Sequence, residues 1–324
     1  MAIPGEKVIH GEVVIRLRAS LIMLPHSAIG GLAPRPRKLR AASSIIMVPI
    51  SSTAVTRMGP RILGGIGANA KLVQSLRPDI SADVKTSNQP GSQGDGMVLA
   101  QKVGAAVVDA KEIQLNPTLL VGSPVIVSET VRGAGAVFVN REGKRFISEL
   151  TTRDVTSAAV SKQTGGTAFE IFDDKVRQSV KQTGAAFELG LAKEGKTLAE
   201  LAKNAGIDPK NLEATIAQYN KYAEAGKDPD FNRPGLNAKL KVDKAPFYAI
   251  EITPAIHYYM GGLKFNGKTQ VINTSGKPIG GLYAAGEVTG GVHGKNRLGG
   301  NSISETITFG RLAGENAAAQ VLGK

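Results

Sequence analysis

The chain has 324 residues, of which 42% are hydrophobic and 39 are glycine, and this suits one or two domains with a substantial α/β core. It contains no cysteine, which excludes disulfides, thiolate metal sites and a Cys-x-x-Cys-His haem attachment. The net charge is +13, and no uninterrupted apolar run reaches the roughly 18 residues of a membrane-spanning helix, so we expect no membrane span.

The first 62 residues differ in composition from the rest of the chain. They hold nine Lys and Arg against two acids and have no aromatic residue. Residues 8–24 and 45–55 are typical of strands. The excess positive charge favours a nucleic-acid-binding protein, but basic residues without interleaved aromatics argue against it, and we expect no nucleic-acid partner. Residues 16–33 resemble a signal peptide only weakly, because the stretch starts late and contains Pro25 and His26.

The secondary-structure signals become regular after residue 72. Glycines end several apolar-periodic stretches, and Asp208-Pro209 combines a helix cap with a first-turn proline. Arg141-Glu142-Gly143 is typical of a hairpin turn. The patterns predict helices over residues 97–103, 154–163, 198–204, 209–225 and 303–322, and strands over 105–108, 124–127, 137–140, 144–146 and 247–252.

The last fifth of the chain is the part most typical of a binding site. His257 and Arg297 lie in sequence that is otherwise rich in glycine and small residues, and Gly299-Gly300-Asn301-Ser302 leads into the predicted helix 303–322. Glycine lets backbone approach a ligand closely. A helix N-terminus offers free N–H groups to an electron-rich group. We therefore expect this segment to hold a flat or phosphorylated ligand, with His257 and Arg297 beside it.

From about residue 64 onward the chain resembles the FAD-dependent fumarate reductase flavoproteins of the soluble flavocytochrome c type, which share their FAD-binding domain with succinate dehydrogenase flavoproteins. The resemblance is specific, because five motifs recur in the same order and at matching spacing. They are Gly94-Asp95-Gly96, Glu129-Thr130-Val131-Arg132-Gly133, Asn140-Arg141-Glu142-Gly143-Lys144-Arg145-Phe146, Thr151-Thr152-Arg153-Asp154 and the glycine-rich cluster around His257 and Arg297.

The resemblance implies an α/β fold with an α+β insertion. Residues 63–110 and 256–324 would form a discontinuous Rossmann-like FAD-binding domain, and 111–255 a capping or clamp domain that carries substrate-site residues. Residues 1–62, the atypical basic segment, do not match the family. The cofactor would be FAD, the substrate a small carboxylate, and electrons would come from an external haem or flavin protein. The resemblance also implies a soluble protein, located in the cytoplasm or the periplasm.

One expected motif is missing. In this family the first βαβ unit carries a Gly-x-Gly-x-x-Gly turn for the ADP pyrophosphate. Gly133-Ala134-Gly135 enters a strand rather than a helix, and no such turn is found. The missing motif and the abrupt change in composition favour a truncated gene or an altered reading frame upstream of about residue 62. The full motif in another frame of the source DNA would support this hypothesis.

The resemblance implies that Arg153 delivers the proton in the reduction of an activated C=C bond. Because free arginine has a pKa above about 12, such an acid needs a desolvated site and a relay that restores its proton. Glu129 and Arg132 would be that relay. Without the resemblance, Arg153 would be a helix-start arginine paired with Asp154 or Glu149, and Glu129 and Arg132 an exposed ion pair.

The same resemblance implies two sets of binding residues. His257 and Arg297 would grip the substrate carboxylate, since guanidinium and imidazole N–H groups match its oxygens. Asn116, Ser128 and Gly300 would complete the substrate site. The residues expected to contact the cofactor are Glu287, Ser302, Ile303, Asp95 and Tyr258, with Asn69 as a weaker candidate.

Two departures from the family pattern bear on the substrate. Asn116 replaces a histidine that binds the second carboxylate, and Tyr259 adds a ring that we expect to narrow the pocket. A 2-enoate with one carboxylate is therefore an alternative to fumarate. Two further alternatives stay open: a catalytically inactive remnant that lacks the ADP-binding motif, and a flavoprotein that oxidises aspartate or succinate, which the spacing from Glu129 to Arg153 disfavours.

Overall fold

The computed structural model describes residues 44–47 and 64–323, which lie within one compact unit, residues 42–324. Our predictions for residues 1–43 and 48–63 lie outside the described residues. The described strands are β1 Ser44–Met47, β2 Lys85–Thr86, β3 Val107–Val108, β4 Ile113–Leu120, β5 Val137–Val139, β6 Ala168–Asp173, β7 Ala192–Gly195, β8 Phe247–Tyr259, β9 Gly262–Leu263, β10 Gln270–Ile272 and β11 Pro278–Gly286. The described helices are α1 Ala70–Leu76, α2 Asp95–Gln101, α3 Glu129–Gly133, α4 Arg153–Ser161, α5 Asp174–Ser179, α6 Gly184–Glu188, α7 Leu198–Ala205, α8 Pro209–Ala225 and α9 Asn301–Val321.

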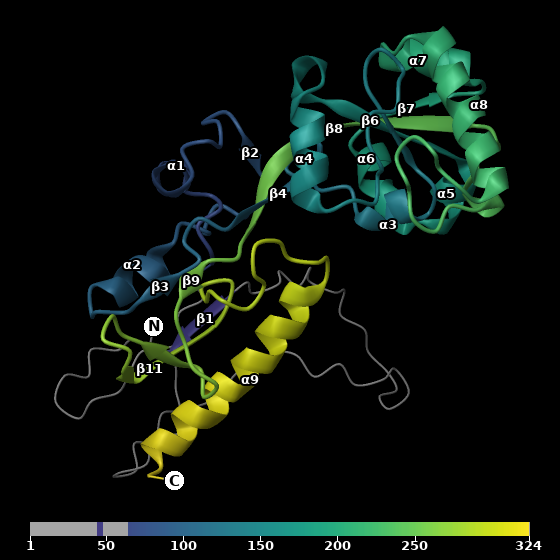
Figure 1. The fold of residues 1–324 in the computed structure, drawn as a ribbon. Coiled ribbons are helices and arrows are strands. Elements are labelled where there is room, and N and C mark those ends of the chain that lie inside the picture. Colours follow the sequence, from purple (N-terminus) through teal and green to yellow (C-terminus); the bar gives the residue numbers. More distant parts are fainter. Residues whose placement is uncertain (1–43, 48–63, 324) are drawn as a thin grey trace, which may run out of the picture. The chain divides into compact units, whose positions relative to one another are not determined.

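Strand β8 organises the larger sheet. Its first half pairs with β6 and β7, and its second half pairs antiparallel with β4 and, over two residues, parallel with β2. Figure 1 shows β8 as one long ribbon that leaves β6 and β7 and passes along β4. The strand predicted to end at residue 252 therefore continues to Tyr259, and it carries His257 with it.

Strand β4 was not predicted, and the reason is Pro117. A proline cannot donate a hydrogen bond to a ladder, so it normally argues against a strand. The structure accommodates Pro117 at an irregularity between Asn116 and Leu119, where the register with β8 shifts. The predicted strand 124–127 is wrong, because this segment forms only an isolated bridge between Leu119 and Ile126.

The predicted helices are confirmed, and their ends follow their caps. The Asp208 side chain accepts a hydrogen bond from Asn211 N at the start of α8, and Gly226 ends that helix in the left-handed region. Thr197 caps α7, and Gly206 ends it. Gly143 adopts φ 73° in the predicted turn, but residues 144–146 have no regular secondary structure and form no strand.

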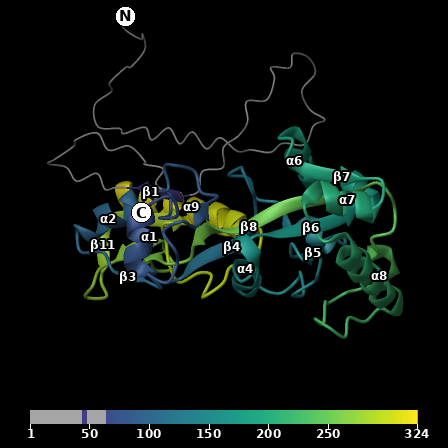
Figure 2. The ribbon, with the colours of Figure 1, turned by 90° about the horizontal axis from the view of Figure 1, so that it is seen from above.

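Apolar residues pack on both faces of the sheet formed by β5, β6 and β8. One face holds Phe138, Phe172 and Ile250. The other holds Phe169, Ile171 and the buried side of α7 and α8, and Figure 2 shows these helices beside β6 and β7. A separate core around Ile66, Met97 and Leu263 joins α1 and α2 to the second half of β8.

A second sheet consists of β1, β11 and β10, which pair antiparallel in that order. Helix α9 packs on β11, with Ala313 buried against Tyr283 and Ala285. Nothing among the helices of the described residues is long and apolar enough to span a membrane. The predicted division into residues 63–110 with 256–324, and 111–255, stays a prediction.

Candidate active site

The central feature of the site is a bidentate ion pair between Arg153 and Glu129. Nε of Arg153 lies 2.6 Å from Oε1 of Glu129, and Nη2 lies 2.8 Å from Oε2. Arg153 is the first residue of α4 and Glu129 the first of α3, so two helix N-termini place the pair. Arg153 does not pair with Asp154, which binds Asn296, or with Glu149, which binds Arg145. The structure therefore contradicts the pairing expected of an ordinary helix-start arginine.

Gln114 connects this pair to the C-terminal segment, and the sequence analysis missed it. Its side-chain oxygen accepts a hydrogen bond from Nη1 of Arg153 at 2.8 Å. Its amide nitrogen donates to the Arg297 backbone oxygen at 2.7 Å and to the Asn296 side chain at 2.6 Å. A polar side chain in the apolar segment Ile113–Leu120 was the available signal, but it lay in a strand that was not recognised.

Gly299 brings its backbone against the same ion pair. A β-carbon at this position would lie 2.5 Å from Oε2 of Glu129 and 3.2 Å from Nη2 of Arg153. Real β-carbons essentially never approach other atoms within 3.0 Å. A side chain at position 299 would therefore push the Glu129 carboxylate out of its present place, and glycine lets the loop before α9 contact α3 and α4 with the ion pair intact.

Arg132 is the second cation beside Glu129. Its Nη2 is 3.4 Å from Oε1 of Glu129, and Nη1 donates to the Glu149 backbone oxygen at 2.9 Å. The Arg132 side chain is 2% exposed, and burial lowers its pKa from the usual value. The Arg153 guanidinium, with Arg132 behind it, lowers the pKa of Glu129, so this carboxylate is ionised at neutral pH.

His257 and Arg297 lie within electrostatic range of the Arg153 pair. Nδ1 of His257 is 2.8 Å from Oγ of Ser87, a second contact that the sequence analysis missed. Burial lowers the pKa of His257 to about 3, and the positive charges of Arg153 and Arg297 add to this effect. Burial also lowers the pKa of Arg297, whose Nε has no hydrogen-bond partner among the described residues. A bound anion would satisfy both groups.

We expect the His257 ring to remain neutral from pH 8 down to about pH 4 in the ligand-free protein. Since the unfolded chain protonates near pH 6.5 and the folded chain near 3, the folded state binds fewer protons in between, and stability falls as the pH drops through that window. Histidine NMR signals followed against pH, with His257→Gln to assign them, check this. A midpoint near 6.5 would contradict the burial seen here.

The C-terminal segment contains a second buried polar cluster around Tyr258. The guanidinium of Arg297 stacks 4.3 Å above the Tyr258 ring, and the Tyr258 hydroxyl donates to Glu305 at 3.1 Å. Glu305 also accepts from Thr289 at 3.2 Å and lies 3.7 Å from His293. Glu305 is on α9, 6% exposed, and was not predicted. The cluster holds the Arg297 side chain in place.

Glu287 and the start of α9 fit the cofactor that the sequence implies. Glu287 is buried and accepts from the backbone N–H groups of Tyr259, at 2.9 Å, and Gly65; its pKa is raised to about 7 by burial. Gly300 precedes α9 as its N-cap, in the left-handed region and without a side-chain cap, and Ile303 in the first turn is 64% exposed. Uncapped N–H groups beside an apolar side chain suit the polar edge of a flavin ring. The pyrophosphate turn of the family is missing from the sequence, so the described residues are matched only to the rest of the cofactor.

The other predicted substrate- and cofactor-binding residues lie in strand β4 and at the starts of helices. The Asn116 side-chain oxygen accepts from Thr118 N and Oγ1, so its amide nitrogen is the group that could donate to a ligand. Ser128 caps α3 through Thr130 N. Asp95 is exposed in the first turn of α2, and Ser302 is partly exposed in the first turn of α9. Asn69 caps α1 through Leu72 N.

The expectation for Tyr259 is wrong. Side chains alternate along a strand, so Tyr258 and Tyr259 point to opposite faces of β8. Tyr258 faces Arg297, whereas Tyr259 is 1% exposed in the core with Leu263, its hydroxyl 3.7 Å from the Met97 sulfur. Its ring therefore fills the core and does not narrow the substrate site.

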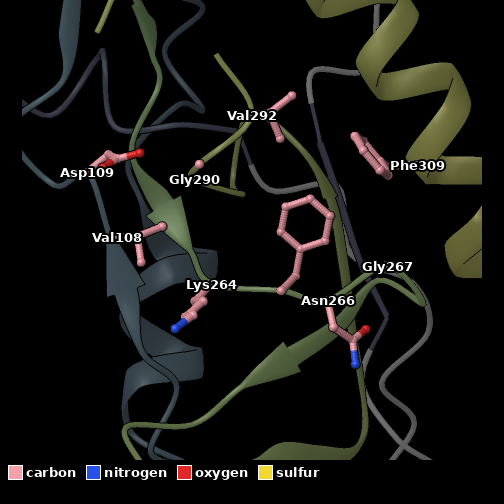
Figure 3. Close-up of a pocket in the computed structure, with 10 residues that line it drawn as sticks. Val108, Asp109, Lys264, Asn266, Gly267, Gly290, Val292 and Phe309 are labelled. Carbon is pink, nitrogen blue, oxygen red and sulfur yellow. The ribbon is translucent and has the colours of Figure 1, made fainter. Parts of the chain in front are cut away.

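A pocket of about 570 Å³ lies apart from these residues (Figure 3). It is lined by Val108 and Asp109, the turn that begins at Lys264, and Phe309 of α9, whose ring packs on Phe265. None of the predicted catalytic, substrate-binding or cofactor-binding residues lines it.

Comparisons with known proteins show which family this chain belongs to. A fumarate reductase (cytochrome) of Shewanella frigidimarina is 51% identical over 255 residues, which are 79% of this chain and 44% of that protein. An NADH:acrylate oxidoreductase of Vibrio harveyi is 37% identical over 321 residues, 95% of this chain and 30% of that protein. The solved open conformation of a flavocytochrome c3 fumarate reductase superposes with a TM-score of 0.65 at 44% identity, covering 79% of this chain and 45% of that one.

The chain spans less than half the length of each of these proteins. The family model described as the FAD binding domain matches residues 58–303. The predicted α/β FAD-binding fold and the predicted cofactor are thereby confirmed. The chain belongs to the FAD-binding domain family, and its cofactor is FAD.

Proposed function

We propose that this chain carries the active site of an FAD-dependent reductase of activated C=C bonds, acting on fumarate or a related 2-enoate. The observation that carries the proposal is the bidentate pair of the buried Arg153 and the partly exposed Glu129, with His257 and Arg297 within electrostatic range. Such an arrangement suits an anionic substrate next to a proton donor.

Arg297 and His257 bind the substrate carboxylate in this proposal. The unpartnered Nε of Arg297 and the neutral imidazole of His257 supply directed N–H donors, and their attraction for the carboxylate polarises the adjacent double bond. Asn116, Ser128 and Gly300 would contact the rest of the substrate. Because an amide carries no charge, Asn116 favours an uncharged group at the position where a second carboxylate would lie.

FAD, when bound, supplies a hydride to the carbon distal to the activating carboxylate. Glu287, Tyr258, Ser302, Ile303 and Asp95 are the residues proposed to hold it. The uncapped first turn of α9 would place N–H groups at the ring, where a helix N-terminus stabilises negative charge.

Arg153 gives a proton to the second carbon of the double bond. One N–H bond of the Arg153 guanidinium breaks as the C–H bond forms. The ionised Glu129, 2.8 Å from Nη2 of Arg153, then accepts a proton from Arg132, whose Nη2 lies 3.4 Å from Glu129, and passes it to the neutral Arg153. A proton donor in the correct position contributes about 10²–10⁴-fold to rate.

The names of the relatives widen the substrate class. Fumarate has two carboxylates, whereas acrylate, which the Vibrio harveyi relative is named for, has one. Asn116, which carries no charge, favours the monocarboxylic 2-enoates within this class. An external haem or flavin protein is the proposed electron donor, and a soluble protein of the cytoplasm or periplasm the proposed setting. Residues 63–110 with 256–324 are proposed as the FAD-binding part, and 111–255 as the cap.

We expect the purified chain to retain flavin absorption near ~450 nm after reconstitution with FAD and desalting. Reduced protein should then be reoxidised anaerobically by fumarate or by a monocarboxylic 2-enoate such as acrylate, and not by the saturated acids. A colourless protein that cannot be reconstituted would support the inactive-remnant alternative, which the missing ADP-binding motif favours. Flavin binding without reoxidation by any 2-enoate would count against the proposed reaction.

A further inference from the structure

Glu170 places a carboxyl group among apolar side chains of the core. It lies in the middle of β6, which is paired on both sides, opposite Phe138 of β5 and Ile250 of β8. Because side chains alternate along a strand, Glu170 shares its face with Ala168 and Phe172. All four of these neighbours belong to one apolar core. Glu170 is 0% exposed.

The only cation near this carboxyl, among the described residues, is Arg132. Nε of Arg132 lies 3.9 Å from Oε1 of Glu170, which is beyond hydrogen-bond distance. Both carboxyl oxygens of Glu170 lack a hydrogen-bond partner, and so do Nε and Nη2 of Arg132. A buried polar atom without a partner is costly and rare in folded proteins. Glu170 and Arg132 therefore face each other, and each side chain keeps hydrogen-bonding atoms that have no partner.

The charged groups that act on Glu170 come from two elements. Arg132 of α3 attracts the carboxylate, and Glu149, in the segment before α4, repels it. Burial outweighs the attraction and raises the pKa of Glu170 to about 8. Arg132 itself is also subject to Glu129, Arg153 and Glu149. The protonation state of Glu170 therefore changes near neutral pH, beside the last member of the proposed relay.

We propose that Glu170 is a positioning residue of the relay, which sets through its own charge how firmly Arg132 holds its proton. As a neutral acid it leaves Arg132 able to pass a proton from Nη2 to Glu129. As a carboxylate, having lost its proton to solvent, it attracts the guanidinium and retains that proton on Arg132. The inference rests on the proposed enoate reduction, because the relay has a role only there.

The pH dependence of turnover tests this in the FAD-loaded protein. For the wild type we expect the rate to fall above pH about 8, by about tenfold per pH unit, as Glu170 ionises. Glu170→Gln and Glu170→Leu cannot ionise and should lack this alkaline decline. The leucine variant suits the apolar surroundings if the glutamine variant does not fold. Glu251→Gln, on the neighbouring strand β8 and 28% exposed, is the matched control and should follow the wild type.

Infrared difference spectra between wild type and Glu170→Gln give a readout without turnover. We expect a protonated carboxyl band at pH 7 that disappears between pH 7 and 9. An ionised carboxylate at pH 7, or an alkaline decline that persists in both variants, would overturn the inference. If no form of the protein reduces any 2-enoate, the proposed function fails, whereas the infrared band still decides whether Glu170 holds a proton.

Discussion

Replacing Arg153 with alanine is expected to lower the rate of enoate reduction by about 10³-fold or more and to leave FAD bound. Arg153 is the donor that the geometry offers, and its loss also leaves Glu129 without its closest cation, at 2.6 Å. The expected loss corresponds to about 4 kcal/mol of transition-state stabilisation. The measurement is reoxidation of the reduced flavin by substrate under anaerobic conditions, with the visible spectrum as a check on flavin content.

Arg141→Ala is the matched control for this experiment. Arg141 also pairs with a glutamate, Glu251, and stacks 5.4 Å from the Phe169 ring, but it is 38% exposed and makes no contact with the Arg153 pair. Its variant should keep the wild-type rate. Arg153→Lys should recover little activity, since a single ammonium cannot form the bidentate pair. Near-normal reduction by Arg153→Ala would show that another group protonates the product.

Replacing Glu149 with glutamine is expected to destabilise the protein by about 3–5 kcal/mol, because it leaves two buried arginines without their shared carboxylate. Glu149 is 0% exposed and accepts from Arg145 Nε at 2.8 Å and from Arg233 Nη1 at 2.7 Å. It also accepts from Phe138 N at 3.2 Å. Asp228 holds Arg145 from the other side at 2.7 Å but does not reach the Arg233 guanidinium.

Thermal unfolding measures this effect, and a fall of roughly 10 °C is expected for a protein of this size. Glu142→Gln serves as the control, because Glu142 is exposed in the turn beside Gly143 and its side chain accepts a hydrogen bond from the Thr164 hydroxyl, which the glutamine oxygen can also accept. That change should alter stability by no more than about 0.5 kcal/mol. Equal thermal unfolding midpoints for Glu149→Gln and Glu142→Gln would mean that the buried arginines find other partners once an amide replaces the Glu149 carboxylate.

The sequence predicted the site residues better than it predicted the strands that place them. Glu129, Arg153, His257 and Arg297 lie in short motifs whose order and spacing are readable from the sequence, and the structure brings them within electrostatic range. Helix ends were predicted for a similar reason: a cap depends on two or three neighbouring residues, as Asp208 and Gly226 show at α8. The assigned roles of these residues stay a proposal.

What the sequence did not show depends on pairing over long distances. Gln114 becomes part of the site only because β4 pairs with β8, more than 130 residues later, at a register that tolerates Pro117. The direction of the Tyr259 side chain depends on which face of β8 is buried. The sequence does not show that face, and the expectation that Tyr259 narrows the pocket was wrong for this reason. Glu305 reaches the site through the packing of α9 on the rest of the chain. Local patterns carry none of this information.

The close approach at Gly299 limits how this chain can be recombined with its relatives. If segment 111–255 were exchanged for that of a relative, the relative's Glu–Arg pair would lie against the loop that holds Gly299. A β-carbon at position 299 would lie 2.5 Å from a carboxylate oxygen of that glutamate. Crossovers in a shuffled library should therefore keep the Arg153–Glu129 geometry only when glycine at 299 is inherited together with the pair. Positions 129, 153 and 299 therefore have to be exchanged together, although 170 residues separate the first from the last.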